Sequence, residues 1–414
     1  MQPRFPEDRY GLALTTDHPD AAADYRQGVD CLLAANAGAG EHLERAVHVD
    51  GRFALAHMAL ALLYDMEGKA GQRQAALCAA TLHAPLATPR ERQHVRILEL
   101  MLRNEPVAAY RLLQVHVREH PLDAFILSQV TGAYGILAFS GKSDFDRERL
   151  SVLESVRASY GHDWWFLGMH AYSLAEVFRH AEAREQAEKS LAIFYHNGHA
   201  AHSYAHVLYE SDRPEEGSAF LAGWLPGYDA RAPIAGHLCW HQALCEAQRG
   251  NHAQALDIYH ARLRPAVTTS PGYGKLIDAA SALWRLGLMG VPVQAAHWQE
   301  LADEMPRHLP ATPDPFLDIH MAVIYAAHRP GNDAWVGALL EKYHAEAHPL
   351  AGLVAQVCRG LCAFAGQDYA HSGALLAAAM PGLPRIGGSH AQRGLVSETL
   401  RYAAAKCRAD ALPE

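Results

Sequence analysis

The chain lacks the patterns that mark sheets, membrane spans and disulfide-rich folds. Alternation of Val, Ile or Thr with polar residues over the length of a strand is almost absent from its 414 residues, so a β-sheet is not expected. Its seven cysteines are scattered and form no CxxC pair, which gives no indication of a disulfide framework or a zinc ribbon. The first residues, MQPRFPEDRYG, lack the apolar run of a signal peptide. The chain also has no uncharged apolar stretch of the about 18 residues needed to span a bilayer. We therefore expect a cytoplasmic globular protein without membrane contact.

Two further absences narrow the possible functions. The net charge is -9 with neutral histidines, and no basic stripe is interleaved with aromatic residues, so nucleic acid is not an expected partner. The chain has no GxGxxG motif after a strand and no Walker loop, so no nucleotide site is indicated. Histidine, in contrast, is abundant, with 27 residues. The sequence thus directs the search for function to its imidazoles.

A helix break recurs along the chain at nearly regular intervals. Alanine and leucine dominate, and nearly every segment between turn signals has a helical period. Steps of 33 to 41 residues separate the later breaks, and repeats of helix, turn and helix with such a period are typical of a tetratricopeptide-type solenoid. The breaks fall near Gly68, His180, Arg213, Gly250, Gly290, Gly331 and Gly366.

We predict an all-α, tetratricopeptide-like α-solenoid. It would be a right-handed superhelix of about ten irregular helix pairs that forms a single body over residues 1–414. The clearest repeats lie in residues 160–380, and residues 386–407 form a C-terminal motif and capping helix.

Four histidines and a glutamate occur within the fifteen residues HNGHAAHSYAHVLYE, which start at His196. On a helix, His199, His202, His206 and Glu210 fall within roughly 80° of one another, so the segment is predicted to be a packed helix with a polar ridge. Three roles remain open for the ridge: a buried ladder of neutral imidazoles, acid–base or substrate-binding chemistry, and metal binding. The HxxxH pattern HSYAH lacks the glutamate of HExxH proteases, which excludes a zincin site. We expect no tightly held metal, although His202, His206 and His241 could supply three ligands.

The first helix of each pair lines the inner face of such a stack. The ridge, His237 with His241, and the face formed by Asp278, Ser281 and Arg285 all lie on predicted first helices, so their polar groups should converge on one channel. Asp318 and His320 are roughly 200° apart on the next helix, and at most one of them can share that channel. Arg285 could clamp an anion through its bidentate guanidinium or form an internal ion pair with Asp278. Trp240 is expected in the core.

The segment IGGSHAQRG is the most loop-like motif of the chain. Gly387 and Gly388 permit unusual backbone angles, and Ser389 is a suitable N-cap for the last helix. His390 and Arg393 would then lie in its first turn, where backbone N–H groups favour an anion. Other histidines are expected to be solvated near helix ends or polar faces, among them His42, His83, His116, His308 and His344.

Several motifs resemble those of the tetratricopeptide repeat protein 38-like family, in matching order and spacing along most of the chain. The sequence departs from the family pattern at Gly394, where an aspartate is usual, and at His170, in an otherwise ordinary repeat helix. The resemblance implies a tetratricopeptide-like fold but transfers no activity. The motifs are YGLALTT with Thr15 and Thr16, AHVLYESDRPEEG from Ala205, WHQAL from Trp240, DAASALWRL from Asp278, DIHMA from Asp318 and IGGSHAQR from Ile386.

Two functions remain open on the sequence. In the first, which we favour, an enclosed polar pocket binds or converts a small anionic molecule by histidine acid–base chemistry; whether it is an enzyme stays open. In the second, the chain is an interaction scaffold that holds a partner peptide in its groove, and it could also form a homo-oligomer. The candidate catalytic residues are His202, His206, Glu210, His241 and His390, and the candidate substrate-binding residues are Asp278, Ser281, Trp284, Arg285, His320 and Arg393.

Overall fold

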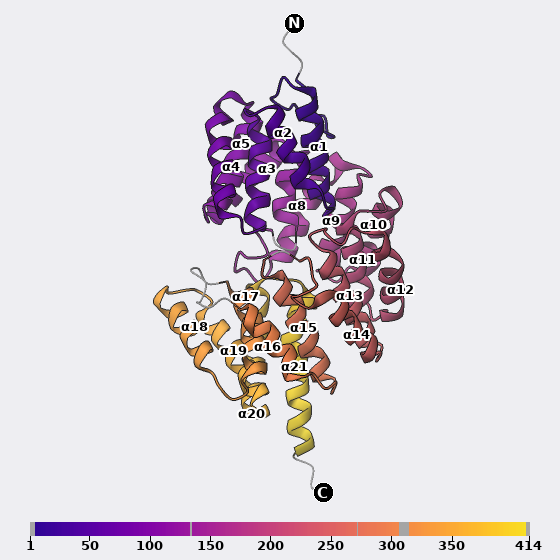
Figure 1. Cartoon of the computed structure of the whole chain (residues 1–414), viewed down its shortest axis with the longest axis vertical. Helices are drawn as coiled ribbons and strands as arrows, with labels where there is room; N and C mark the ends of the chain where they lie inside the picture. Colours follow the sequence, from indigo (N-terminus) through magenta and orange to yellow (C-terminus); the bar gives the residue numbers. More distant parts are fainter. Residues whose placement is uncertain (1–4, 133–134, 271, 306–313, 411–414) are drawn as a thin grey trace. The chain divides into compact units, whose positions relative to one another are not determined.

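The computed structural model describes residues 5–132, 135–270, 272–305 and 314–410. Within these ranges the chain forms α-helices α1 to α21 and no strand, apart from an isolated β-bridge between Glu7 and Ala13 (Figure 1). The predicted all-α fold class is confirmed. Among the helices described, none combines the length and the apolarity that a bilayer crossing demands.

The chain divides into two compact units. Unit 1 comprises Met1–Leu137, Asp146–Tyr204 and Gly227–Ile234, and unit 2 comprises Ala138–Phe145, Ala205–Pro226 and Ala235–Glu414. The handedness of the stack and the single body over the whole chain stay predictions.

In unit 1, consecutive helices pack as pairs, clearest for α1 with α2, α3 with α4, α5 with α6 and α9 with α10. Helix α8 lies in unit 1 except for its first residue, and α11 passes from unit 1 to unit 2 after Tyr204. The helices are α1 (Pro19–Ala34), α2 (Ala39–Val49), α3 (Ala54–Met66), α4 (Ala70–His83), α5 (Pro89–Leu102), α6 (Pro106–Glu119), α7 (Ala124–Thr131), α8 (Phe145–Tyr160), α9 (Trp164–Ala175), α10 (His180–Ile193) and α11 (Gly198–Glu210), with a short 3-10 turn, η1 (Ala84–Leu86).

In unit 2, every second helix packs against the next one of its kind: α13 contacts α15, α15 contacts α17, and α17 contacts α19. These contacts place one helix of each pair in a shared layer, as expected for a helical-repeat stack. The elements are α12 (Pro214–Trp224), η2 (Leu225–Gly227), α13 (Ala235–Gln248), α14 (His252–Ile258), the π-helical η3 (Tyr259–Leu263), α15 (Gly274–Leu288), α16 (Ala295–Glu304), α17 (Pro315–His328), α18 (Ala334–Ala345), α19 (Ala351–Ala365), α20 (Tyr369–Ala379), η4 (Met380–Ile386) and α21 (His390–Asp410).

The core of unit 2 is built from the layer that these helices share. Trp240 of α13, Leu283 of α15, Ile319 of α17 and Leu361 of α19 all belong to one cluster of buried apolar residues. Trp240 is fully buried, so its predicted place in the core is confirmed. The polar residues of the same helices are consequently held by a rigid apolar support.

The helix breaks predicted from the sequence are confirmed by the backbone. Gly68, Gly250, Gly290 and Gly331 have φ angles of 71°, 80°, 83° and 78°, the left-handed region that glycine enters without steric cost. At the other three breaks a side-chain-bearing residue takes this role, with φ of 63° at Phe178, 57° at Asp212 and 65° at Gln367.

All seven cysteines are free thiols. Cys239 and Cys245 of α13 and Cys358 and Cys362 of α19 are buried, whereas Cys78 is exposed. Burial raises the pKa of the Cys239 thiol to about 11 and that of Cys245 to about 12, so these groups are protonated and unreactive in the folded state.

Candidate histidine centre

The predicted polar ridge lies on α11, where the predicted helix is confirmed. His206 is completely buried, and its Nδ1 lies 3.1 Å from Oε1 of Glu210, one turn further along the same helix. A carboxylate that accepts from Nδ1–H fixes the orientation of the ring and leaves the lone pair on Nε2. His206 and Glu210 therefore form the first of two imidazole–carboxylate pairs in unit 2.

The second pair joins α13 to α15. His237 Nδ1 lies 2.9 Å and 3.1 Å from the two carboxylate oxygens of Asp278. The side chains of His237 and Asp278 are 14% and 9% exposed, so the pair is mostly buried and lies close to the surface. As in the first pair, a carboxylate that accepts from Nδ1–H leaves the lone pair of the imidazole on Nε2.

His241 of α13 joins the two pairs. Its side chain is completely buried, and its ring centroid lies 4.4 Å from that of His206 and 4.9 Å from that of His237. Each of the three imidazoles offers one ring nitrogen, and these nitrogens lie within 4.8 Å of one another. We call the five residues His206, Glu210, His237, His241 and Asp278 the histidine centre.

His202 lies one turn before His206 on α11, in the part of the helix that belongs to unit 1. It is 7% exposed, and its ring centroid lies 5.6 Å from that of Tyr172. In unit 1, the ridge residue His202 therefore packs against an aromatic ring. Burial lowers the pKa of the His199 imidazole to about 4.

Arg285 and Ser281 lie beside the centre, on the same helix as Asp278, but their polar groups bond elsewhere. The buried guanidinium of Arg285 donates from Nε to Glu398 at 3.1 Å, from Nη2 to the carbonyl of Ala391 at 2.6 Å, and from Nη1 to Ser281. Neither sequence alternative for Arg285 describes this arrangement, because its carboxylate partner is Glu398 of α21 and Asp278 pairs with His237. Trp284 likewise donates to α21, at 2.8 Å from Thr399 Oγ1.

His320 and Asp318 of α17 point to different partners, as their angular separation requires. His320 Nδ1 donates to the carbonyl of Phe316 at 2.8 Å, and burial lowers the pKa of this imidazole to about 4. The charges of Arg285 and Asp278 also act on the pKa of this imidazole. Asp318 accepts from Tyr343 at 2.7 Å, and burial raises the pKa of its carboxyl to about 6.

The C-terminal motif is organised by capping. The N–H of Gln392 donates to Ser389 Oγ at 3.2 Å, and the N–H of Ser389 donates to Gln392 Oε1 at 3.0 Å, so the predicted N-cap is confirmed. Arg393 donates to the carbonyl of Gly388, and His390 is half-buried at the start of α21. Both therefore lie on the first turn of α21 and not within the histidine centre.

Sequence reasoning missed a cluster of buried charges in unit 1. Asp123 accepts from Arg90 at 2.7 Å and lies 3.1 Å from a ring nitrogen of both His94 and His116. Burial alone would raise the pKa of the Asp123 carboxyl, but the neighbouring histidines and Arg90 hold it well below its usual range. The prediction that His116 is solvated is wrong, since its side chain is completely buried; His308 lies outside the described residues.

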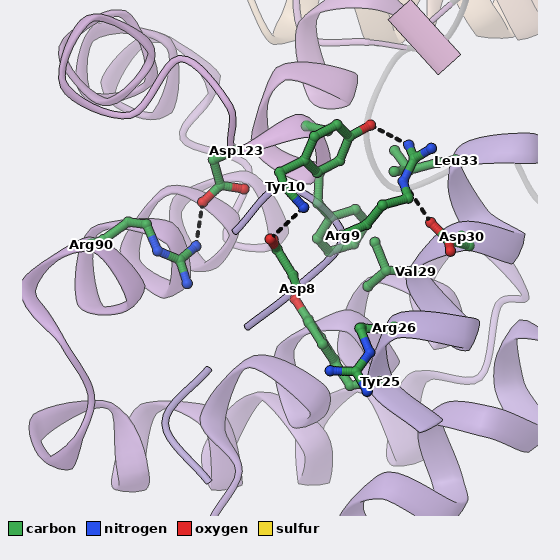
Figure 2. A pocket seen from close by; sticks show the side chains of 12 residues that line it. Asp8, Arg9, Tyr10, Tyr25, Arg26, Val29, Asp30, Leu33, Arg90 and Asp123 are labelled. Atoms are coloured by element: carbon green, nitrogen blue, oxygen red, sulfur yellow. Dashed lines mark hydrogen bonds and ion pairs between the residues drawn. The ribbon is translucent and has the colours of Figure 1, made fainter. Parts of the chain in front are cut away.

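Figure 2 shows the Arg90–Asp123 pair at the edge of a small cavity in unit 1, which Asp8, Arg9 and Tyr10 also line. Its volume of about 20 Å³ accommodates a single water molecule. A larger groove of about 520 Å³ lies elsewhere in unit 1, lined by side chains of α8, α9 and α10 that include Arg157 and Lys189.

No protein-family model matches the chain. Among solved structures, the chain is similar to a tetratricopeptide repeat protein from Parabacteroides merdae ATCC 43184, with 14% sequence identity and a TM-score of 0.35. The match covers 76% of this chain and 98% of that chain.

Proposed function

We propose that this helical-repeat protein binds or converts a small molecule at the histidine centre of unit 2. The observation that carries the proposal is the convergence of two imidazole–carboxylate pairs, His206–Glu210 and His237–Asp278, on a third imidazole, His241. A carboxylate behind Nδ1 makes Nε2 a better proton acceptor and stabilises the imidazolium that forms. Such a pair can act as a general base, and after protonation as a general acid.

The cost of burying these groups supports a functional role. Five ionisable side chains occupy positions that apolar residues could fill, and buried polar groups lower stability unless each is paired. The surrounding core residues, such as Trp240 and Leu244, are apolar and fully or almost fully buried. A core selected for stability alone would extend that apolar packing through the centre.

The proposal does not depend on a negatively charged ligand. The anionic ligand suggested by the sequence relied on Arg285 and Arg393, whose guanidinium groups donate to Glu398 and to backbone carbonyls. Glu210 and Asp278 also add negative charge to the centre. Without a bound cation, an anion would therefore be favoured only when the imidazoles are protonated.

The test uses His206→Gln, which keeps a polar side chain but removes proton transfer near neutral pH. Purified protein is screened by thermal shift and turnover against small carboxylic acids, phosphate esters and amines. For a compound that is turned over, we expect His206→Gln to fold normally and to lose about 10²-fold or more in rate. The control is His170→Gln, because His170 is also buried and lies 2.8 Å from a carboxylate, Glu154, but belongs to α9 and not to the histidine centre. A His206→Gln protein that melts several degrees lower with unchanged activity would show that the centre is structural.

A second candidate function, an interaction scaffold for a partner peptide, is favoured by the groove of about 520 Å³ in unit 1. Arg157, Lys189 and Glu154 line it, and both cations pair with carboxylates, Arg157 with Glu154 and Lys189 with Glu185, so a polar peptide of mixed charge is the best match. In that case partner binding would be unaffected by His206→Gln. Membership of the tetratricopeptide repeat protein 38-like family also remains a proposal; its motifs WHQAL and DAASALWRL contain His241 and Asp278.

A further inference from the structure

The ring nitrogens of the histidine centre lie close enough together to bind one metal ion. Zinc binds imidazole nitrogens at about 2.0–2.1 Å in tetrahedral geometry, which places the nitrogens roughly 3.4 Å from one another. The ring nitrogens of His206, His237 and His241 already lie within 4.8 Å of one another. Rotation of the three side chains is the movement that would bring these nitrogens to bonding distance of one ion.

The hydrogen bonds behind two of the imidazoles support the same conclusion. Histidines that bind metals almost always donate their other ring N–H to a carboxylate, a carbonyl or a water, which fixes the tautomer and makes the ligand more basic. His206 Nδ1 lies 3.1 Å from Glu210, and His237 Nδ1 lies 2.9 Å from Asp278. In both rings Nδ1 faces a carboxylate, so Nε2 is the nitrogen that a metal would take.

The balance of charge agrees with a dication. Glu210 and Asp278 each contribute one carboxylate to the centre, and the nearby Glu398 is neutralised by Arg285. A divalent ion bound to the three imidazoles would be attracted by the carboxylates of Glu210 and Asp278. Because uncompensated charge in a buried site is costly, the ion would offset part of the cost of burying these carboxylates.

We infer that His206, His237 and His241 bind one divalent transition-metal ion of the zinc class. Three nitrogen ligands suit zinc and other late first-row transition metals better than calcium or magnesium, which prefer oxygen ligands. Three protein ligands also leave one position for water or substrate, as in catalytic zinc sites, where bound water has a pKa of about 7. The inference deepens the proposed function and rests on it for the role of the site. The sequence pointed the other way, because HSYAH supplies two ligands and His237 has little signal of its own.

The test is metal binding by the full chain. Protein stripped with a chelator is titrated with zinc by calorimetry, and with cobalt by visible absorption, which reports tetrahedral coordination directly. We expect one ion per chain, at least about 100-fold weaker binding for His241→Gln and His237→Gln, and a roughly 10- to 100-fold loss for Asp278→Asn. His170→Gln should bind as the wild type does, because its imidazole lies outside the centre. Circular dichroism checks that each variant is folded.

Two results would overturn the inference: no stoichiometric zinc or cobalt binding by the folded wild type, or unchanged affinity in His241→Gln. Failure of the metal inference is distinguishable from failure of the proposed function. If zinc does not bind but His206→Gln abolishes turnover, the acid–base proposal stands alone. If zinc binds with one ion per chain but no compound is bound or converted, the metal site stands and the small-molecule function fails.

Discussion

At the scale of single residues, buried carboxylates in this protein lie within hydrogen-bond distance of several donor side chains. Asp123 is the clearest example, with Arg90, His94 and His116 within 3.1 Å of one oxygen. Such a cluster stabilises the fold only while its charges match, because removing one member leaves the others buried without compensation.

Asp123→Asn should therefore destabilise unit 1 strongly. The amide keeps an acceptor but removes the charge opposite Arg90, and we expect a loss of about 3–5 kcal/mol in the free energy of unfolding, measured in urea. Asp229→Asn is the matched control, since Asp229 also pairs with an arginine, Arg231, but both are exposed; it should change stability by less than about 1 kcal/mol. Equal effects of the two substitutions would contradict the prediction.

His320 makes stability depend on pH in a defined direction. Its pKa is about 4 in the folded protein and about 6.5 when unfolded, so between these values the unfolded chain binds the extra proton. Stability from this group is complete above about pH 6.5 and falls as the pH drops towards 4, by about 2 kcal/mol between pH 7 and pH 5. Asp318 acts in the opposite sense, because its raised pKa of about 6 lets the folded state bind the proton first.

Urea unfolding of the wild type and His320→Gln at pH 7 and pH 5 separates the two groups. The variant should lose about 2 kcal/mol less than the wild type over this interval. An identical pH dependence would show that His320 does not titrate on unfolding.

At the scale of helices, the sequence predicted where elements end better than how they touch. Gly250 and Gly290 are recognisable breaks because glycine enters the left-handed region freely. The left-handed Phe178 has no such signal; it lies in the turn between α9 and α10, which pack against each other. Close approach of helices is equally hidden: a Cβ on Gly28 of α1 would lie 2.7 Å from Leu43 Cγ of α2.

Gly28→Val should therefore separate α1 from α2 and cost about 1–3 kcal/mol in stability. Thermal and urea unfolding measure the change. Gly71→Ala in α4 is the control, because a Cβ there would meet no atom within 4 Å, and it should be neutral or slightly stabilising. A Gly28→Val protein as stable as Gly71→Ala would contradict the close packing of the pair.

At the scale of the whole molecule, periodicity predicted which residues share a helix face but not which partners they would meet. The ridge on α11 follows from a spacing of three and four residues. The His237–Asp278 pair joins residues 41 apart, and the Arg285–Glu398 pair joins residues 113 apart. Such pairs depend on how successive helices pack, which no local pattern encodes, and for this reason Glu398 and the Asp123 cluster were not anticipated.

The different exposure of the free thiols allows the rate at which α13 opens to be measured. Cys239 and Cys245 are protected within α13, the helix that carries His237 and His241, whereas Cys78 is already exposed. An alkylating reagent should label Cys78 at once and the α13 thiols only as fast as that helix opens. Their labelling half-times, read by mass spectrometry peptide by peptide, would time the opening of the histidine centre without any engineered probe. Any ion or compound that closes the centre should lengthen those half-times and leave Cys78 unchanged.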